Sequence, residues 1–152
     1  MSNMVDKDLG WGKLLRFFAA GGYEVRVGFP DGKVDPVIVD RAAYNEFGTS
    51  NGVPARPFLS TAIDRNSKRY TRHLAKGIGR RLLRRASTRD VLSEIGEMAK
   101  ADIQESITTW TSPPNTLSTQ RKKGEDNPLV ETGRMWDEVT YVIRRKSKNT
   151  TG

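Results

Sequence analysis

The sequence has no cysteine and only one histidine in 152 residues. A chain without cysteine can form no disulfide, no thiolate nucleophile and no thiolate metal site. The single histidine, His73, lies between Arg72 and Lys76 in a basic segment, where no neighbouring residue offers the orienting acid or nucleophile that a catalytic histidine needs. We therefore expect His73 to be a solvated surface residue, and we predict no catalytic residue, no metal site and no cofactor.

Long apolar runs are also absent. Residues 14–20 form a short apolar run, but Arg16 interrupts it, so the run fits neither a signal sequence nor a membrane span. Apolar residues make up 36% of the chain, which is less than in an average globular domain. Charged residues make up 29%, which is more than average. These values predict a soluble, intracellularly made protein with no membrane partner and with extended or solvated parts.

The length is typical of a single domain, which we place at residues 1–145, followed by a disordered tail at 146–152.

We expect a short helix at 9–20. Apolar and polar residues then alternate over 23–29, a period of two that predicts a half-buried strand. Turn residues follow the strand at Pro30-Asp31-Gly32.

Residues 37–47 show both strand-like and helix-like spacing, and we choose a helix that Gly48 ends. A long helix is predicted at 58–85, with Pro57 in its first turn, where the missing N–H costs nothing. Gly77 and Gly79 are expected to weaken the middle of this helix.

A second long helix is predicted at 88–110, because its apolar residues form one amphipathic stripe. Ser87 or Thr88 can supply its N-cap, and Asp90 is favourable in its first turn. Its polar residues include carboxylate pairs at the spacing a magnesium nuclease could use: Glu94 with Glu97, and Asp102 with Glu105. We favour the simpler interpretation that all four belong to a solvated helix face.

The chain closes with a long loop at 111–127, rich in Ser, Thr, Pro and Gly, and a strand within 135–144. The predicted fold is α+β: a small antiparallel sheet packed against two long helices, with a flexible loop and a C-terminal tail. Because two strands alone are marginally stable, we expect either a third strand within 34–56 or 111–134, or a partner chain that completes the sheet.

Positive charge is concentrated between Asp64 and Asp90, where no acid occurs, and the whole chain has a formal net charge of +8. The basic residues of this segment are Arg65, Lys68, Arg69, Arg72, Lys76, Arg80, Arg81, Arg84, Arg85 and Arg89. Those that recur every four residues, and so are expected to line one helix face, are Lys68, Arg72, Lys76, Arg80 and Arg84. An acidic protein surface, nucleic acid and solvent all remain open as the surroundings of this face. We find no motif for sequence-specific nucleic-acid binding.

Two regions far apart in the sequence, 43–59 and 128–134, each join apolar anchors to residues that dictate backbone shape and to a single arginine, which suits a rigid corner or contact surface better than a reaction centre. With two shorter motifs between them, they give five segments: Ala43-Tyr44-Asn45-Glu46-Phe47-Gly48-Thr49, Pro54-Ala55-Arg56-Pro57-Phe58-Leu59, Ile95-Gly96, Pro113-Pro114-Asn115 and Pro128-Leu129-Val130-Glu131-Thr132-Gly133-Arg134. In their order and spacing, over residues 22–145, they resemble the small tail-completion or neck proteins of tailed bacteriophages, a minor tail protein family at the head–tail junction.

The resemblance implies a non-enzymatic virion structural protein that assembles as an oligomeric ring, with a hexamer as the family-level expectation. Its partners would be copies of itself and other phage neck and tail proteins, with non-specific contact to channel DNA as a further option. Its location would be the virion, at the head–tail junction or tail end, after synthesis in the host cytoplasm. The alternative function is that of a basic protein that binds nucleic acid non-specifically.

The resemblance also implies roles for individual residues. Phe47 would pack inward at a helix end, and residues 132–134 would lead into the final strand. The interface candidates are Arg56, Phe58 and Arg134, together with Arg72, Lys76, Arg80 and Arg84 on the basic helix. Maintenance of the fold is the competing explanation for the motif residues.

Overall fold

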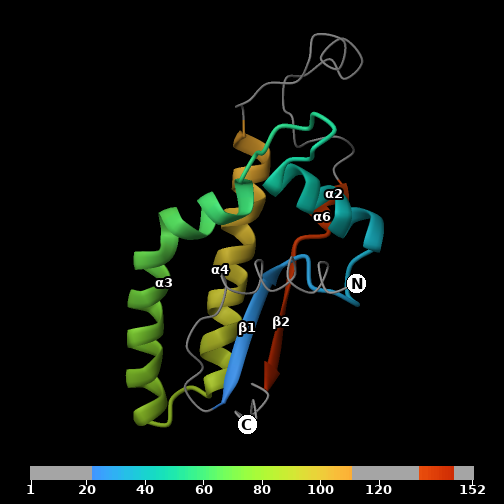
Figure 1. Cartoon of the computed structure of the whole chain (residues 1–152). Helices are drawn as coiled ribbons and strands as arrows, with labels where there is room; N and C mark the ends of the chain where they lie inside the picture. The colour runs from blue at the N-terminus through green and yellow to red at the C-terminus, as the bar shows by residue number, and fades with distance from the viewer. Residues whose placement is uncertain (1–21, 111–133, 146–152) are drawn as a thin grey trace, which may run out of the picture.

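The computed structural model describes residues 22–110 and 134–145 (Figure 1). In chain order the elements are β1 (Tyr23–Gly28), α2 (Pro36–Phe47), α3 (Phe58–Leu82), α4 (Thr88–Thr109), α6 (Arg134–Asp137) and β2 (Thr140–Arg145). The fold is therefore α+β, as predicted. The helix expected at 9–20, the loop at 111–127 and the tail at 146–152 lie outside the described residues.

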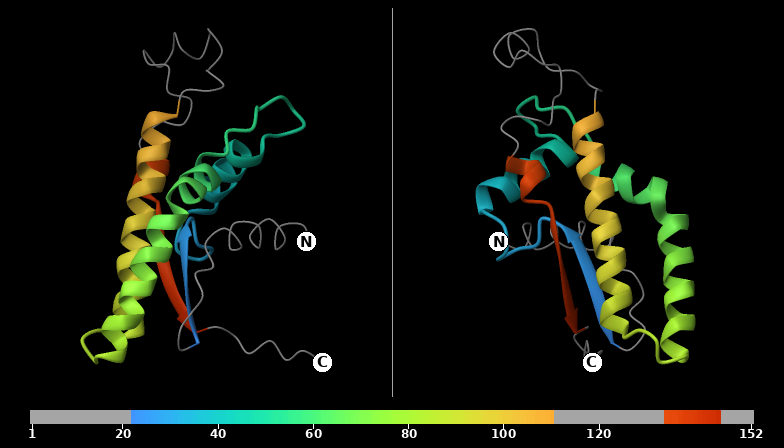
Figure 2. Two further views of the ribbon diagram at one scale, coloured as in Figure 1. Left: turned by 90° about the vertical axis from the view of Figure 1, so that its left-hand side faces the viewer. Right: turned by 180° about the vertical axis from the view of Figure 1, so that it is seen from behind.

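The sheet consists of β1 and β2, which pair antiparallel from Tyr23 opposite Arg145 to Gly28 opposite Thr140. Helix α4 packs against both strands and against α3. Viewed from behind, α4 lies between the strand pair and α3 (Figure 2). The sheet thus meets one of the two long helices directly, and the core forms where α4, the sheet, α2 and the start of α3 converge.

Helix α2 begins where Asp35 accepts a hydrogen bond from the backbone N–H of Val37 at 3.0 Å, with Pro36 in the first turn. It buries Ile38 and Ala42, and it ends at Gly48, whose positive φ of 73° suits glycine. The choice of helix over strand for this segment is confirmed. No strand forms within 34–56, so that range does not hold the third strand; most of 111–134 lies outside the described residues.

Helix α3 begins at Phe58 as predicted, although Pro57 is its N-cap and not part of its first turn, and it ends at Leu82 instead of near Arg85. Arg84 has a positive φ of 55°, so the chain has already left the helix there. Gly77 also has a packing role that the sequence did not indicate. A Cβ atom on Gly77 would lie 2.3 Å from a Val91 methyl carbon, so this glycine allows α3 and α4 to approach closely.

Helix α4 matches its prediction closely. Ser87 and Asp90 form a capping box, in which Ser87 Oγ accepts from the Asp90 N–H at 3.1 Å and Asp90 accepts from the Ser87 N–H at 2.8 Å. The apolar stripe is buried, namely Val91, Leu92, Ile95, Ala99, Ile103 and Ile107. Gly96 lies against the ring of Tyr141, where a Cβ would approach to 2.6 Å, and this contact brings α4 onto β2.

The predicted final strand is confirmed as β2, but the short helix α6 before it was not anticipated. Gln104 of α4 joins α6 by donating a hydrogen bond to the Trp136 carbonyl at 3.1 Å. Within the described ranges, no helix is both long and apolar enough to cross a membrane.

Candidate interaction surfaces

Residues 43–49 and 54–59, which carry much of the sequence resemblance, contact one another in a corner between α2 and α3. The Arg56 N–H donates to the Asn45 carbonyl at 2.5 Å, and the Arg56 guanidinium reaches the Asn45 side-chain oxygen at 3.4 Å. Gly48 packs so tightly that a Cβ there would lie 2.9 Å from the Ala55 nitrogen. The two motifs thus form one closed structural unit, which we call the α2–α3 corner.

Glu46 closes this corner by capping α3. Its buried carboxylate accepts hydrogen bonds from the N–H groups of Leu59 at 2.9 Å and Ser60 at 3.1 Å, and from the Ser60 hydroxyl. Pro57 provides no side-chain cap of its own. Burial raises the pKa of the Glu46 carboxyl, while these hydrogen bonds oppose the rise by favouring its charged form. This role was not predicted from the sequence, although Glu46 lies in a motif that precedes a helix without an N-cap side chain of its own.

Two of the predicted interface residues turn out to be internal. Phe58 is completely buried and packs edge-on against Phe29, with ring centroids 6.4 Å apart. Arg56 is only 6% exposed, and burial lowers the pKa of its guanidinium. A side chain without accessible surface cannot contact a neighbouring subunit, so the interface role expected of Phe58 is wrong, and Arg56 serves mainly to maintain the corner.

The expectation that Phe47 packs inward is also wrong, because its side chain is half exposed on the outer face of α2. Arg134 is the first residue of α6. The contacts predicted for the Arg134 side chain lie outside what the structure describes.

The basic residues of α3 divide into an exposed group and a group that faces α4. Lys68, Arg72 and Lys76 are exposed along the helix. Arg80, by contrast, bonds to Glu94 of α4, and Arg84 lies beyond the end of the helix. The predicted row of five basic residues is therefore not continuous. Glu94 of α4 pairs with Arg80, and the helix ends before it reaches Arg84.

Glu94 of α4 forms hydrogen bonds and ion pairs with side chains of α3. We call such a polar link between the two helices a polar tie. Glu94 accepts hydrogen bonds from Arg80 at 3.0 and 2.5 Å, and it lies 2.6 Å from the Nε2 atom of His73. The bond from Arg80 is the main cause that lowers the pKa of Glu94 to about 2, and His73 contributes. The prediction of a solvated His73 without a nearby acid is corrected by this contact. Within residues 22–110 and 134–145, Glu94 is the only side chain to which His73 bonds.

Asp102 forms a second, deeper tie. It is buried and accepts hydrogen bonds from the hydroxyl of Tyr70 and the guanidinium of Arg69. Burial, reinforced by Asp102, raises the pKa of the Tyr70 phenol, which keeps it a hydrogen-bond donor. Glu94 and Asp102 are thus partners of α3 instead of members of a solvated face, whereas Glu97 and Glu105 are exposed as expected. Among the described residues, no group of three or more His, Asp or Glu side chains is placed to hold a metal ion.

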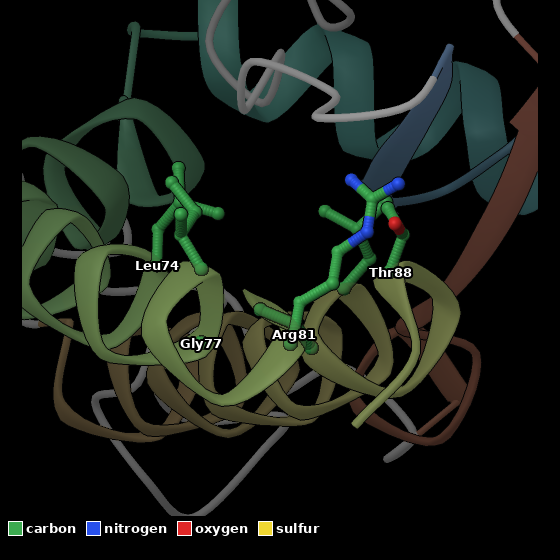
Figure 3. A pocket seen from close by; sticks show the side chains of 7 residues that line it. Leu74, Gly77, Arg81 and Thr88 are labelled. Atoms are coloured by element: carbon green, nitrogen blue, oxygen red, sulfur yellow. The ribbon is translucent and has the colours of Figure 1, made fainter. Parts of the chain in front are cut away.

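The turn between α3 and α4 exposes large apolar side chains beside arginines. Leu82 is 80% exposed and Leu83 66%. A small apolar pocket lies between Leu74, Gly77 and Ile78 of α3 and Val91 and Leu92 of α4. Figure 3 shows Leu74, Arg81 and Thr88 around this pocket. We call residues 78–85 the hairpin tip.

The outer edge of β2 borders a second opening. This open hollow is lined by Thr140, Tyr141, Val142 and Ile143 of the strand, with Lys33, Arg89 and Ser93 around it. An edge strand presents unpaired backbone groups that another chain can use.

Comparison of the chain with protein-family models, with curated proteins and with solved structures finds no match. The residues and surfaces above are therefore the basis on which a function is assigned.

Proposed function

We propose that this protein is a structural component of a bacteriophage virion, which completes the tail or joins the head to the tail. It works by assembling as an oligomeric ring and docking to neighbouring neck and tail proteins, not by catalysis. The observation that carries the proposal is the α2–α3 corner. Two of the segments that carry the resemblance to the phage family, residues 43–49 and 54–59, bond to each other through Asn45, Glu46 and Arg56.

The form of the sheet supports the same proposal. Within the described ranges the sheet has two strands, so β1 and β2 each have an outer edge without a strand neighbour. Two-stranded sheets are marginal alone, and edge strands readily accept a strand from another chain. The hollow beside β2 leaves room for such an addition. A small sheet with open edges is expected of a subunit whose sheet is completed by strands from its neighbours.

A measurement of mass tests the proposal. The purified chain, whose monomer mass is 17.0 kDa, is expected to form a discrete oligomer in solution and to bind assembled tail-tube protein. A hexamer is the expected ring. The protein is also expected in purified phage particles. A strict monomer that binds no tail-tube protein and is missing from the particles contradicts the proposal.

The alternative function, non-specific binding of nucleic acid, is favoured by one observation. Lys68, Arg72 and Lys76 form an exposed row on α3, with further exposed arginines at the hairpin tip. Binding to phosphates releases counterions, so the logarithm of affinity would fall with the logarithm of salt concentration by about 0.9 per phosphate neutralised. A steep slope with duplex DNA supports this alternative, and absent or salt-insensitive binding removes it.

A further inference from the structure

Helix α2 carries an exposed apolar face. Val37, Asp40, Tyr44 and Phe47 follow one another at intervals of three and four residues, which places them on one side of the helix. Val37 is 59% exposed, Tyr44 49% and Phe47 50%. Large apolar side chains gathered on one helix face are typical of a contact surface. We call these four residues the α2 stripe.

The surroundings of the α2 stripe are acidic. Asp40 lies within it, and Asp31 and Asp35 are exposed just before the helix. Lys33 and the half-buried Arg41 offset part of this charge. Asp40 forms no ion pair with another described residue.

The hairpin tip has the opposite character. Its exposed apolar side chains are Ile78, Leu82 and Leu83. Arg81, Arg84 and Arg85 are exposed among them. In the part of the chain that the structure describes, these arginines form no ion pair, because the acids of α4 pair with Arg69 and Arg80 instead.

The α2 stripe and the hairpin tip lie at opposite ends of the molecule (Figure 1). One chain cannot join its own tip to its own stripe at that separation. Two tips facing each other would bring like charges together, which is unfavourable, whereas a basic tip on an acidic stripe is complementary in charge and in apolar character.

We propose that the hairpin tip of one copy docks on the α2 stripe of a second copy. The inference deepens the proposed function and rests on its ring-forming part. A contact between two different surfaces leaves a free tip on one copy and a free stripe on the other, so further copies add in the same way. When the rotation between copies closes, the product is a ring.

DNA and an anionic membrane are other occupants of the tip. DNA phosphates would bind Arg81, Arg84 and Arg85 but would make no favourable contact with the exposed leucines. An anionic membrane would bind both the arginines and the leucines. Neither accounts for the acidic and aromatic α2 stripe, which a second copy explains together with the tip.

Charge exchange tests the contact by sedimentation velocity of the full chain over a range of concentrations. Arg81→Glu with Arg84→Glu alters the tip, and Asp40→Arg alters the stripe. Each change alone is expected to weaken self-association at least about tenfold, because it places like charges together. All three changes in one chain restore opposite charges and are expected to recover most of the association. Arg65→Glu and Glu105→Arg reverse exposed charges elsewhere on α3 and α4 and are expected to have little effect.

A second variant, Leu82→Ser, tests the apolar part without touching the core, because this side chain is already mostly exposed. It is expected to weaken self-association while leaving thermal unfolding of the isolated chain unchanged.

The outcomes separate this contact from the proposed function. An oligomer that still forms when either the tip charges or the stripe charge alone is reversed overturns the contact but leaves ring assembly intact. A wild-type chain that stays monomeric overturns both. Tip variants that change binding to duplex DNA or anionic vesicles, but not self-association, also overturn the contact. Association that follows the charge exchange supports the contact even where the protein is missing from phage particles.

Discussion

Glu46 caps a helix that begins well beyond it in the sequence. Its carboxylate accepts from the Leu59 and Ser60 N–H groups at the start of α3, where Pro57 contributes no side-chain bond. The first N–H groups of a helix have no partner within the helix, and leaving them buried without an acceptor is costly. Glu46 therefore fixes α3 to the end of α2 and holds the corner on which the proposed function rests.

Replacing Glu46 with Ala is expected to lower the free energy of unfolding by about 2 kcal/mol, because buried N–H groups lose their acceptor. Glu46→Gln should cost less, since its amide oxygen still accepts one hydrogen bond. Urea unfolding of the purified variants measures both. Glu105→Ala, at an exposed position of α4, is the control and should change stability by no more than about 0.5 kcal/mol. A loss for Glu46→Ala no larger than that of the control would show that the cap is unimportant.

Residue roles were only partly predictable from the sequence. The motifs around Asn45 and Arg56 correctly indicated a structural corner, because Gly and Pro constrain the local backbone. They did not indicate which side chains face inward. Phe58 is buried and Phe47 half exposed because exposure depends on contacts such as Phe29 against Phe58, between residues far apart in the sequence.

The two long helices form a hairpin held by contacts of different kinds. Glycine at position 77 allows α3 to approach Val91 of α4, and the acids Glu94 and Asp102 bond to basic and phenolic groups of α3. The close approach and the polar ties together fix the position of α3 relative to α4, and so the position of the hairpin tip that joins them.

Gly77→Ala tests the close approach. Alanine normally stabilises a helix interior by up to about 1 kcal/mol relative to glycine. At position 77 the added methyl group would overlap Val91, and overpacking of this kind costs about 1 to 3 kcal/mol. We expect a net loss of stability in denaturant unfolding. Gly79→Ala is the matched control, because a Cβ there meets no atom within 4 Å, and it should stabilise the protein. Stabilisation by both substitutions would contradict the proposed packing.

Glu94→Gln tests the polar tie through pH. The folded protein lowers the pKa of Glu94 from 4.5 to about 2, mainly through Arg80, so the folded state binds fewer protons than the unfolded state between those values. The contribution of this carboxylate to stability is therefore present above about pH 4.5 and is lost as the pH falls toward 2. The unmodified protein should lose more stability between pH 5 and 3 than Glu94→Gln does. Denaturant unfolding across that range measures the difference.

The control for this pH series is Glu105→Gln, at an exposed carboxylate that forms no ion pair with a described residue. Its stability should follow that of the unmodified protein as the pH falls. An identical pH dependence for Glu94→Gln and the unmodified protein would contradict the tie.

Helix α4 was predictable because its signals are local. Ser87 and Asp90 lie within one turn, and the apolar stripe repeats along the helix itself. The ties between helices were not predictable in this way. Glu94 and His73 are 21 residues apart, and Asp102 and Arg69 are 33 apart, so only the path of the hairpin brings them together.

The surfaces of the described residues are consistent with the proposal that this protein assembles with neighbouring subunits. The sheet has outer edges, the α2 stripe is apolar and acidic, and the hairpin tip at the other end is apolar and basic. Sequence alone showed the excess of positive charge but not its separation from the acids of α2. That separation follows from the hairpin, which carries the tip away from α2.

Electron microscopy of particles assembled without this protein tests the proposed role in the virion. We expect a defect at one end of the tail: separate heads and tails if the protein joins them, or tails of irregular length if it completes the tail. Restoring the protein should correct the defect. Particles that form intact, joined and of normal tail length in its absence would contradict the proposed role.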